Sequence, residues 1–162
     1  MQEYVSDAVV LAKEDRGDLD HTVSVFTKLY GKIRGKTKST KKITSKLSGH
    51  LETGNLVRVR FIEKGGLQIV DALKTEKAKI SHTDLHHLNQ ILGEGEPDFH
   101  IWAALQRPFN WKVVLRILGW DPEEADCFKC GGQAQTFHTK NQEFFCSSCA
   151  SKIPESELIY LE

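Results

Sequence analysis

The sequence predicts an α+β protein built from small modules: a small antiparallel β-barrel or meander, a short helical region and a C-terminal four-cysteine ribbon. Three observations support this. Short segments rich in β-branched and aromatic residues fill about the first 75 residues, helical periodicity follows them, and all four cysteines lie in the last quarter. A chain of 162 residues has room for two or three small domains. We expect them at residues 1–76, 77–126 and 127–162.

Five strands are expected in the first module, without intervening helices. In one of them Val57, Val59 and Phe61 alternate with Arg58 and Arg60, so the two arginines should share the outer face. Five short strands in so short a stretch are typical of a small barrel or meander. The expected strands are residues 4–12, 21–29, 32–38, 54–62 and 67–73.

Three short helices are expected in the second module. Ser81 can cap the first, which carries leucines at helical spacing and ends at residue 93. The second is expected at residues 97–107, between two prolines, and the third begins after the cap Asn110 and ends at residue 119.

The four cysteines form two C-x2-C pairs separated by fifteen residues, which is the spacing of a zinc ribbon. Each pair can bring two thiolates to one side of an ion, and a hairpin between the pairs can complete a tetrahedral shell. Two disulfides, a redox pair and a catalytic zinc are the alternatives, and the doubled spacing favours a structural site over them. His138 could replace a cysteine as a metal ligand, but it lies in the middle of the hairpin and is expected on the surface. We therefore predict one structural Zn²⁺ held by Cys127, Cys130, Cys146 and Cys149.

Positive charge is concentrated in one segment, although the whole chain has 22 basic and 22 acidic residues. No acid occurs between His21 and Leu51. Alternate residues of the expected strand 32–38 are basic, and two strand residues advance ~6.6 Å. Two nucleotides of one B-form strand span ~6.8 Å, so this row could follow a phosphate backbone. Lysines that protect an edge strand from aggregation are the alternative. The predicted nucleic-acid contacts are Lys32, Arg34, Lys36, Lys38, Lys41, Lys42, Lys46, Arg58 and Arg60.

Three aromatic residues of the first module, Phe26, Tyr30 and Phe61, could stack on bases. Aromatic residues at strand spacing more often belong to the core, and Tyr30 is the best stacking candidate of the three.

Catalytic signatures are absent from the sequence. It contains no phosphate-binding loop, no nucleophile elbow and no H-E-x-x-H, so we expect no enzyme. An aspartate cluster at residues 15–20 is typical of a turn, and the histidines at 82–87 are expected at the surface of a helix or packed against it. No apolar run approaches the ~20 residues of a membrane helix, and no signal peptide is apparent. We expect a cytoplasmic protein without a membrane partner.

Several segments together resemble the bacterial RecO family of recombination mediators. They are the strand-turn-strand at 10–28, the run from Tyr30 to Gly35, the segment 47–52, and Leu118 to Pro122 before the two cysteine pairs. The resemblance implies an N-terminal OB-fold, binding of single- and double-stranded DNA, strand annealing, and loading of recombinase with RecR. It also implies action at the bacterial nucleoid.

The helical region is shorter than is usual in the family. The pocket for the tail of single-stranded-DNA-binding protein belongs to that region, so this partner is expected less strongly than DNA. An RNA-binding or translation-associated protein and a protein-interaction adaptor are the alternative functions.

Overall fold

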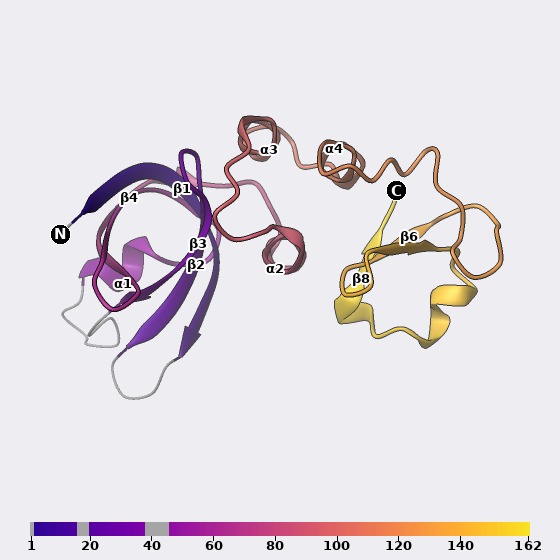
Figure 1. The fold of residues 1–162 in the computed structure, drawn as a ribbon, viewed down its shortest axis with the longest axis horizontal. Coiled ribbons are helices and arrows are strands. Elements are labelled where there is room, and N and C mark those ends of the chain that lie inside the picture. The colour runs from indigo at the N-terminus through magenta and orange to yellow at the C-terminus, as the bar shows by residue number, and fades with distance from the viewer. Residues whose placement is uncertain (1, 16–19, 38–45) are drawn as a thin grey trace. The chain divides into compact units, whose positions relative to one another are not determined.

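The computed structural model describes residues 2–15, 20–37 and 46–162. It divides into two compact units, residues 1–102 and 103–162. The barrel and the first helix after it belong to the first unit, and the cysteine ribbon belongs to the second (Figure 1). The three-part division with boundaries at residues 76 and 126 stays a prediction.

The first unit contains a closed five-stranded barrel with strand order β1-β2-β3-β5-β4. Every neighbouring pair is antiparallel except β3 and β5, which close the barrel with a parallel pairing at Lys36 and Gln68. Because the sheet closes, the first module is a barrel and not an open meander. The strands are β1 (Glu3–Asp15), β2 (His21–Thr27), β3 (Gly31–Thr37), β4 (Asn55–Glu63) and β5 (Leu67–Lys77).

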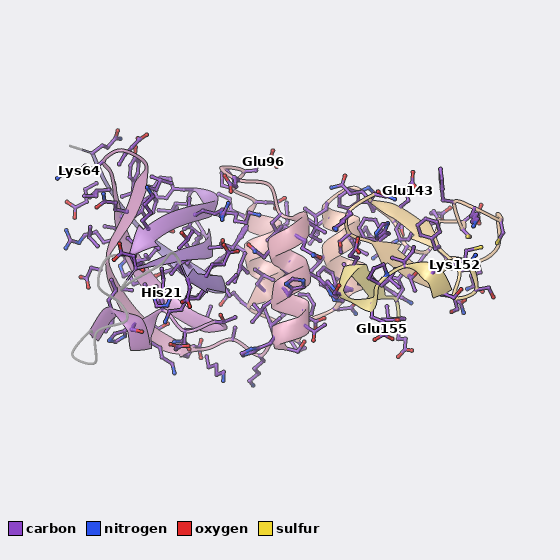
Figure 2. The ribbon with its side chains drawn as sticks, turned by 90° about the horizontal axis from the view of Figure 1, so that it is seen from below. His21, Lys64, Glu96, Glu143, Lys152 and Glu155 are labelled. Carbon is purple, nitrogen blue, oxygen red and sulfur yellow. The ribbon has the colours of Figure 1, made fainter. Side chains whose placement is uncertain are left out.

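The barrel interior is filled by alternate residues of the strands. Val57, Val59 and Phe61 lie in this core, as the alternation with arginine predicts. Closure also depends on Gly35, because a Cβ at this position would lie 2.7 Å from Cγ1 of Ile69 on β5. The lack of a side chain lets the two closing strands approach each other. Figure 2 shows the side chains, with Lys64 at the turn between β4 and β5.

A short helix that the sequence analysis did not predict, α1 (Lys46–His50), lies between β3 and β4. Asn55 holds its C-terminal end: the Asn55 side chain donates to the carbonyl oxygens of Gly49 (3.3 Å) and His50 (3.0 Å). Leu51, directly after the helix, is completely buried in the barrel core. The helix therefore anchors the downstream end of the basic segment to the barrel.

The helices after the barrel largely match the expected ones. In α2 (His82–Ile91) the hydroxyl of Ser81 accepts from the backbone N–H of Asp84 at 3.1 Å, which confirms the predicted cap. Asn110 likewise caps α4 (Trp111–Ile117). In α3 (Phe99–Leu105) the cap is Asp98, which accepts from two backbone N–H groups of the first turn. No helix among the described residues is long and apolar enough to cross a membrane.

The second unit contains a three-stranded antiparallel sheet of order β7-β6-β8. The predicted hairpin is β6 (Thr136–His138) and β7 (Glu143–Phe145). The tail adds β8 (Leu158–Tyr160), after the 3₁₀ turns η1 (Cys149–Lys152) and η2 (Glu155–Glu157), none of which was predicted. Phe137, at the centre of β6, is completely buried and makes a ring contact with Trp120. The third strand gives the small ribbon a core that the hairpin alone would lack.

Candidate metal centre and nucleic-acid interface

The four cysteines come together in space. Their sulfur atoms all lie within 4.8 Å of one another, and all four thiols are free. The sulfurs of Cys130 and Cys146, one from each C-x2-C pair, are 3.7 Å apart. A tetrahedral shell with metal–sulfur bonds of about 2.3 Å has sulfur–sulfur edges of about 3.8 Å. The cluster therefore has the donor set and the spacing to hold a metal ion.

Tight turns direct backbone N–H groups at the sulfurs. Gly131 has φ of +76°, which allows the chain to turn after the first pair, and the N–H of Gly132 then donates to the sulfur of Cys130 at 3.4 Å. In the second pair the N–H of Cys149 donates to the sulfur of Cys146 at 3.4 Å. Such bonds stabilise thiolates, the form in which cysteine binds a metal.

The thiols have unequal acidities. Burial alone would raise the pKa of Cys127, but backbone N–H groups around its sulfur lower it to about 6. Hydrogen bonding with Cys146, together with burial, raises the pKa of Cys149 to about 12. One thiolate therefore forms readily, whereas full deprotonation of the cluster requires a cation to balance the charge.

His138 does not belong to the cluster, and it does not lie on the surface as expected. It is 7% exposed, and its Nε2 lies 3.2 Å from Oε1 of Glu157 in η2. The expectation of a surface histidine was wrong because β8 and η2 fold back over β6. The sequence of the hairpin alone does not indicate that a later segment covers it.

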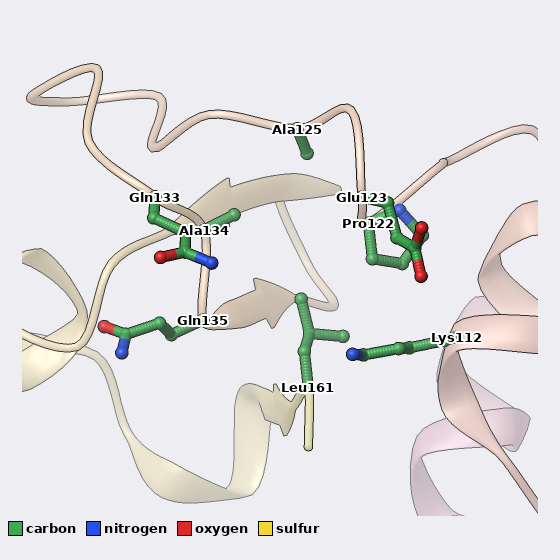
Figure 3. A pocket seen from close by; sticks show the side chains of 8 residues that line it. All are labelled: Lys112, Pro122, Glu123, Ala125, Gln133, Ala134, Gln135 and Leu161. Carbon is green, nitrogen blue, oxygen red and sulfur yellow. The ribbon is translucent and has the colours of Figure 1, made fainter.

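The second unit also has a hollow of about 430 Å³ (Figure 3). Its lining includes the charged groups of Lys112 and Glu123 and the amides of Gln133 and Gln135. The Gln135 side chain already accepts from the N–H of Ser147 at 2.9 Å. Among the described residues, none of the predicted site residues lines this hollow.

The predicted basic row on β3 is shorter than expected. Arg34 and Lys36 are exposed, but Lys32 is only 8% exposed, and its ammonium donates to the backbone carbonyl of Asn89 at 2.7 Å. The periodicity correctly placed the three residues on one side of the strand, but the end of α2 covers the first of them. Lys38, Lys41, Lys42 and the side chain of Lys46 lie outside the described residues.

The exposed arginines of the barrel pair with acids of β1. Arg58 lies 3.1 Å from Asp7 and directly opposite it in the strand register, and Arg60 lies 2.7 Å from Glu3. Arg34 of β3 lies 3.4 Å from Glu14. These exposed pairs reduce the positive charge that the arginines offer to a phosphate. Sequence analysis missed them because the partners are far apart along the chain.

The aromatic residues belong mainly to the core. Phe26 and Phe61 are 1% and 2% exposed, which confirms the core interpretation for both. Tyr30 is half-buried, with its ring centroid 5.2 Å from that of Tyr4 and 5.6 Å from that of Phe61 in edge-to-face arrangements. Tyr30 therefore closes an aromatic cluster instead of standing free.

The alternative metal sites do not form in the part of the chain that the structure describes. There the cysteines are the only group of three or more potential ligands close enough to share an ion. Asp15 contacts His21 at 2.9 Å, and His87 is buried in α2.

The comparison with protein families agrees with the barrel. Residues 1–78 match the family model described as "Recombination protein O N terminal", an OB-fold domain of DNA recombination and repair proteins. No curated protein matches the chain. The family match ends at the last residues of the barrel, and the closed order β1-β2-β3-β5-β4 with α1 between β3 and β4 is the architecture expected of an OB-fold. Residues 1–78 are therefore a recombination protein O (RecO) N-terminal domain, which places the chain's barrel in a family of DNA recombination and repair proteins.

Proposed function

We propose that this chain is a non-enzymatic DNA-binding recombination mediator of the RecO kind, which binds single- and double-stranded DNA and promotes strand annealing. The observation that carries the proposal is the RecO N-terminal domain at residues 1–78, whose strand β3 leads directly into the acid-free lysine segment. RecR is the proposed partner in recombinase loading, with single-stranded-DNA-binding protein as a further one. The proposed place of action is the bacterial cytoplasm, at the nucleoid.

The strongest phosphate contacts should come from lysines of the acid-free segment between His21 and Leu51. Lys36 is exposed on β3, and the lysines at positions 38, 41, 42 and 46 follow it along the chain. Arg34, Arg58 and Arg60 must first leave their carboxylate partners, so we assign them a smaller share. Lys32 is not one of the proposed phosphate contacts, because its side chain is buried and its ammonium already bonds to the carbonyl of Asn89.

Annealing would follow from charge neutralisation. Two complementary strands repel each other through their phosphates, and a basic surface lowers that repulsion while base pairing supplies the driving force. No covalent step by the protein is required. In the second unit, the four-cysteine cluster would hold one structural Zn²⁺ and stabilise the ribbon.

The salt dependence of DNA binding tests the proposal. If about five lysines each neutralise one phosphate of a single strand, log affinity should fall with log salt with a slope of about −3.5. Fluorescence anisotropy with a labelled oligonucleotide measures this slope. The double variant Lys41→Gln/Lys42→Gln should make it shallower by about 1.4.

A matched control is Lys152→Gln, an exposed lysine of the second unit, which should leave the slope unchanged. Affinity that does not change with salt would refute phosphate neutralisation. Equal competition by RNA of the same sequence would show a general nucleic-acid binder and not a DNA mediator. Failure to bind either polymer, with capture of RecR, would identify an adaptor.

A further inference from the structure

The outer face of β2 is not free, although nucleic acid commonly lies across strands 2 and 3 of an OB barrel. Val23 and Val25 belong to the barrel core, so the residues between and beside them point outward. These outward residues are buried as well: Thr22 is 6% exposed, Ser24 3% and Phe26 1%. Because side chains alternate along a strand, burial at every position means that side chains of neighbouring strands or another segment cover the outer face. Thr22 and Ser24 lie between Glu14 of β1 and Arg34 of β3, which pair across β2 at 3.4 Å.

The segment that follows the barrel covers β1 and the start of β3. Helix α2 packs against the barrel wall at β1 (Figure 1), and residues 92–96 continue beside the first residues of β3. The N–H of Gly95 donates to the carbonyl of Lys32 at 2.9 Å, and Lys32 pairs with Glu94 in a parallel bridge. A Cβ at Gly31 would lie 2.4 Å from the carbonyl carbon of Glu96, so the two backbones touch where Gly31 has no side chain.

The side chain of Lys32 fastens this cover. Its ammonium donates to the carbonyl of Asn89 in the last turn of α2 at 2.7 Å. Burial lowers the pKa of Lys32, while the nearby Glu94 carboxylate acts in the opposite direction. Detaching α2 would break this bond and expose Leu85 and Leu88, which are completely buried. Helix α2 should therefore stay packed on the barrel and should not open when a ligand binds.

We infer that α2 and residues 92–96 are a fixed cover, fastened by Lys32, over the outer face of β1 and the start of β3, so that DNA contacts β3 only from Arg34 onward. The inference rests on the proposed function and adds where on the barrel the DNA interface lies. It also makes residues 79–96 part of the DNA-binding unit, although the family match ends at residue 78.

Lysine reactivity in the full chain tests the cover without any mutation. The protein is labelled with an amine-acetylating reagent, with and without an oligothymidine single strand, and each lysine is quantified by mass spectrometry. Lys36 should react in the free protein and become several-fold less reactive with DNA. Lys32 should stay unreactive in both states. Acetylation of Lys32 in either state would overturn the inference. If Lys32 reacts only when DNA is bound, α2 is a lid that moves on binding.

Two matched variants on the same side of β3 separate fastening from DNA contact. Lys36→Met should make the salt slope shallower by about 0.7. Lys32→Met should leave the slope unchanged and accelerate hydrogen exchange at the Gly95 amide. An equal change of slope in both variants would overturn the inference. If the wild-type protein does not bind DNA, the proposed function is refuted. If it binds DNA but Lys32 is reactive, only the inference of a cover is refuted. If Lys32→Met does not fold, the labelling of the wild-type chain still decides.

Discussion

Removal of the metal from the cysteine cluster should unfold residues 127–149 and leave the barrel folded. The perturbation is a strong chelator, or Cys130→Ser, which replaces the most exposed of the four ligands. The two units are separately compact, and the barrel has a core of its own, so loss of structure in the ribbon need not spread to it.

The structure shows why the stability of the ribbon should depend on the metal. The ribbon buries four large apolar side chains, those of Phe137, Phe145, Leu158 and Ile159. Burying four such side chains contributes about 6–12 kcal/mol. A structural Zn²⁺ in a small ribbon contributes about 10–16 kcal/mol at neutral pH. The metal therefore contributes an amount comparable to or larger than these apolar contacts, and the ribbon should not keep its fold without it.

Three measurements check this prediction. Native mass spectrometry should show one zinc ion per chain, hydrogen exchange should show loss of protection in residues 127–149 after chelation, and salt-dependent DNA binding should be largely retained. Ser148→Ala is the matched control, because Ser148 lies between Cys146 and Cys149 and its side chain makes no capping bond. Retained protection in the ribbon after metal loss would refute the reasoning. Loss of DNA binding with an intact barrel would instead make the ribbon a DNA-contacting element.

Two further predictions concern stability. Gly31→Ala should destabilise the barrel by roughly 2–5 kcal/mol in denaturant unfolding, because φ of +73° disfavours alanine and its Cβ would meet the backbone of Glu96. Gly65→Ala is the control: φ is +59° but no atom lies within 4 Å of the added Cβ, so about 1–2 kcal/mol is expected, and equal losses would contradict the clash. Hydrogen bonding with His138, followed by the influence of Lys140, lowers the pKa of Glu157, so its stabilising contribution should be present at neutral pH and lost as the pH falls below the usual glutamate range. Wild type should therefore lose more stability than Glu157→Gln between pH 7 and about pH 3.5. Acid also removes the metal from both proteins, so the quantity to compare is the difference between their free energies of unfolding at each pH. A difference that does not change with pH would contradict the prediction.

Much of the barrel was predictable because its information is local. Alternation of Val57, Val59 and Phe61 with arginines identifies the inner face of β4 in any sheet. The Ser81 and Asn110 caps are also local signals, since each side chain bonds to a backbone N–H only two or three residues further on. The parallel closure of β3 against β5 was not predictable in this way, because it joins residues distant in sequence.

The sequence by itself determined which residues alternate along each strand, where the capped helices begin, and which four cysteines share a turn geometry suited to a metal. Each depends on backbone geometry within a few residues. Only the tertiary structure decided that Lys32 is buried while Arg34 and Lys36 are exposed, because its partner Asn89 is 57 residues away. It likewise paired Arg58 with Asp7 and covered His138 with the C-terminal tail. A periodic pattern fixes the side of a strand on which a residue lies, and packing of distant segments decides whether that side meets solvent.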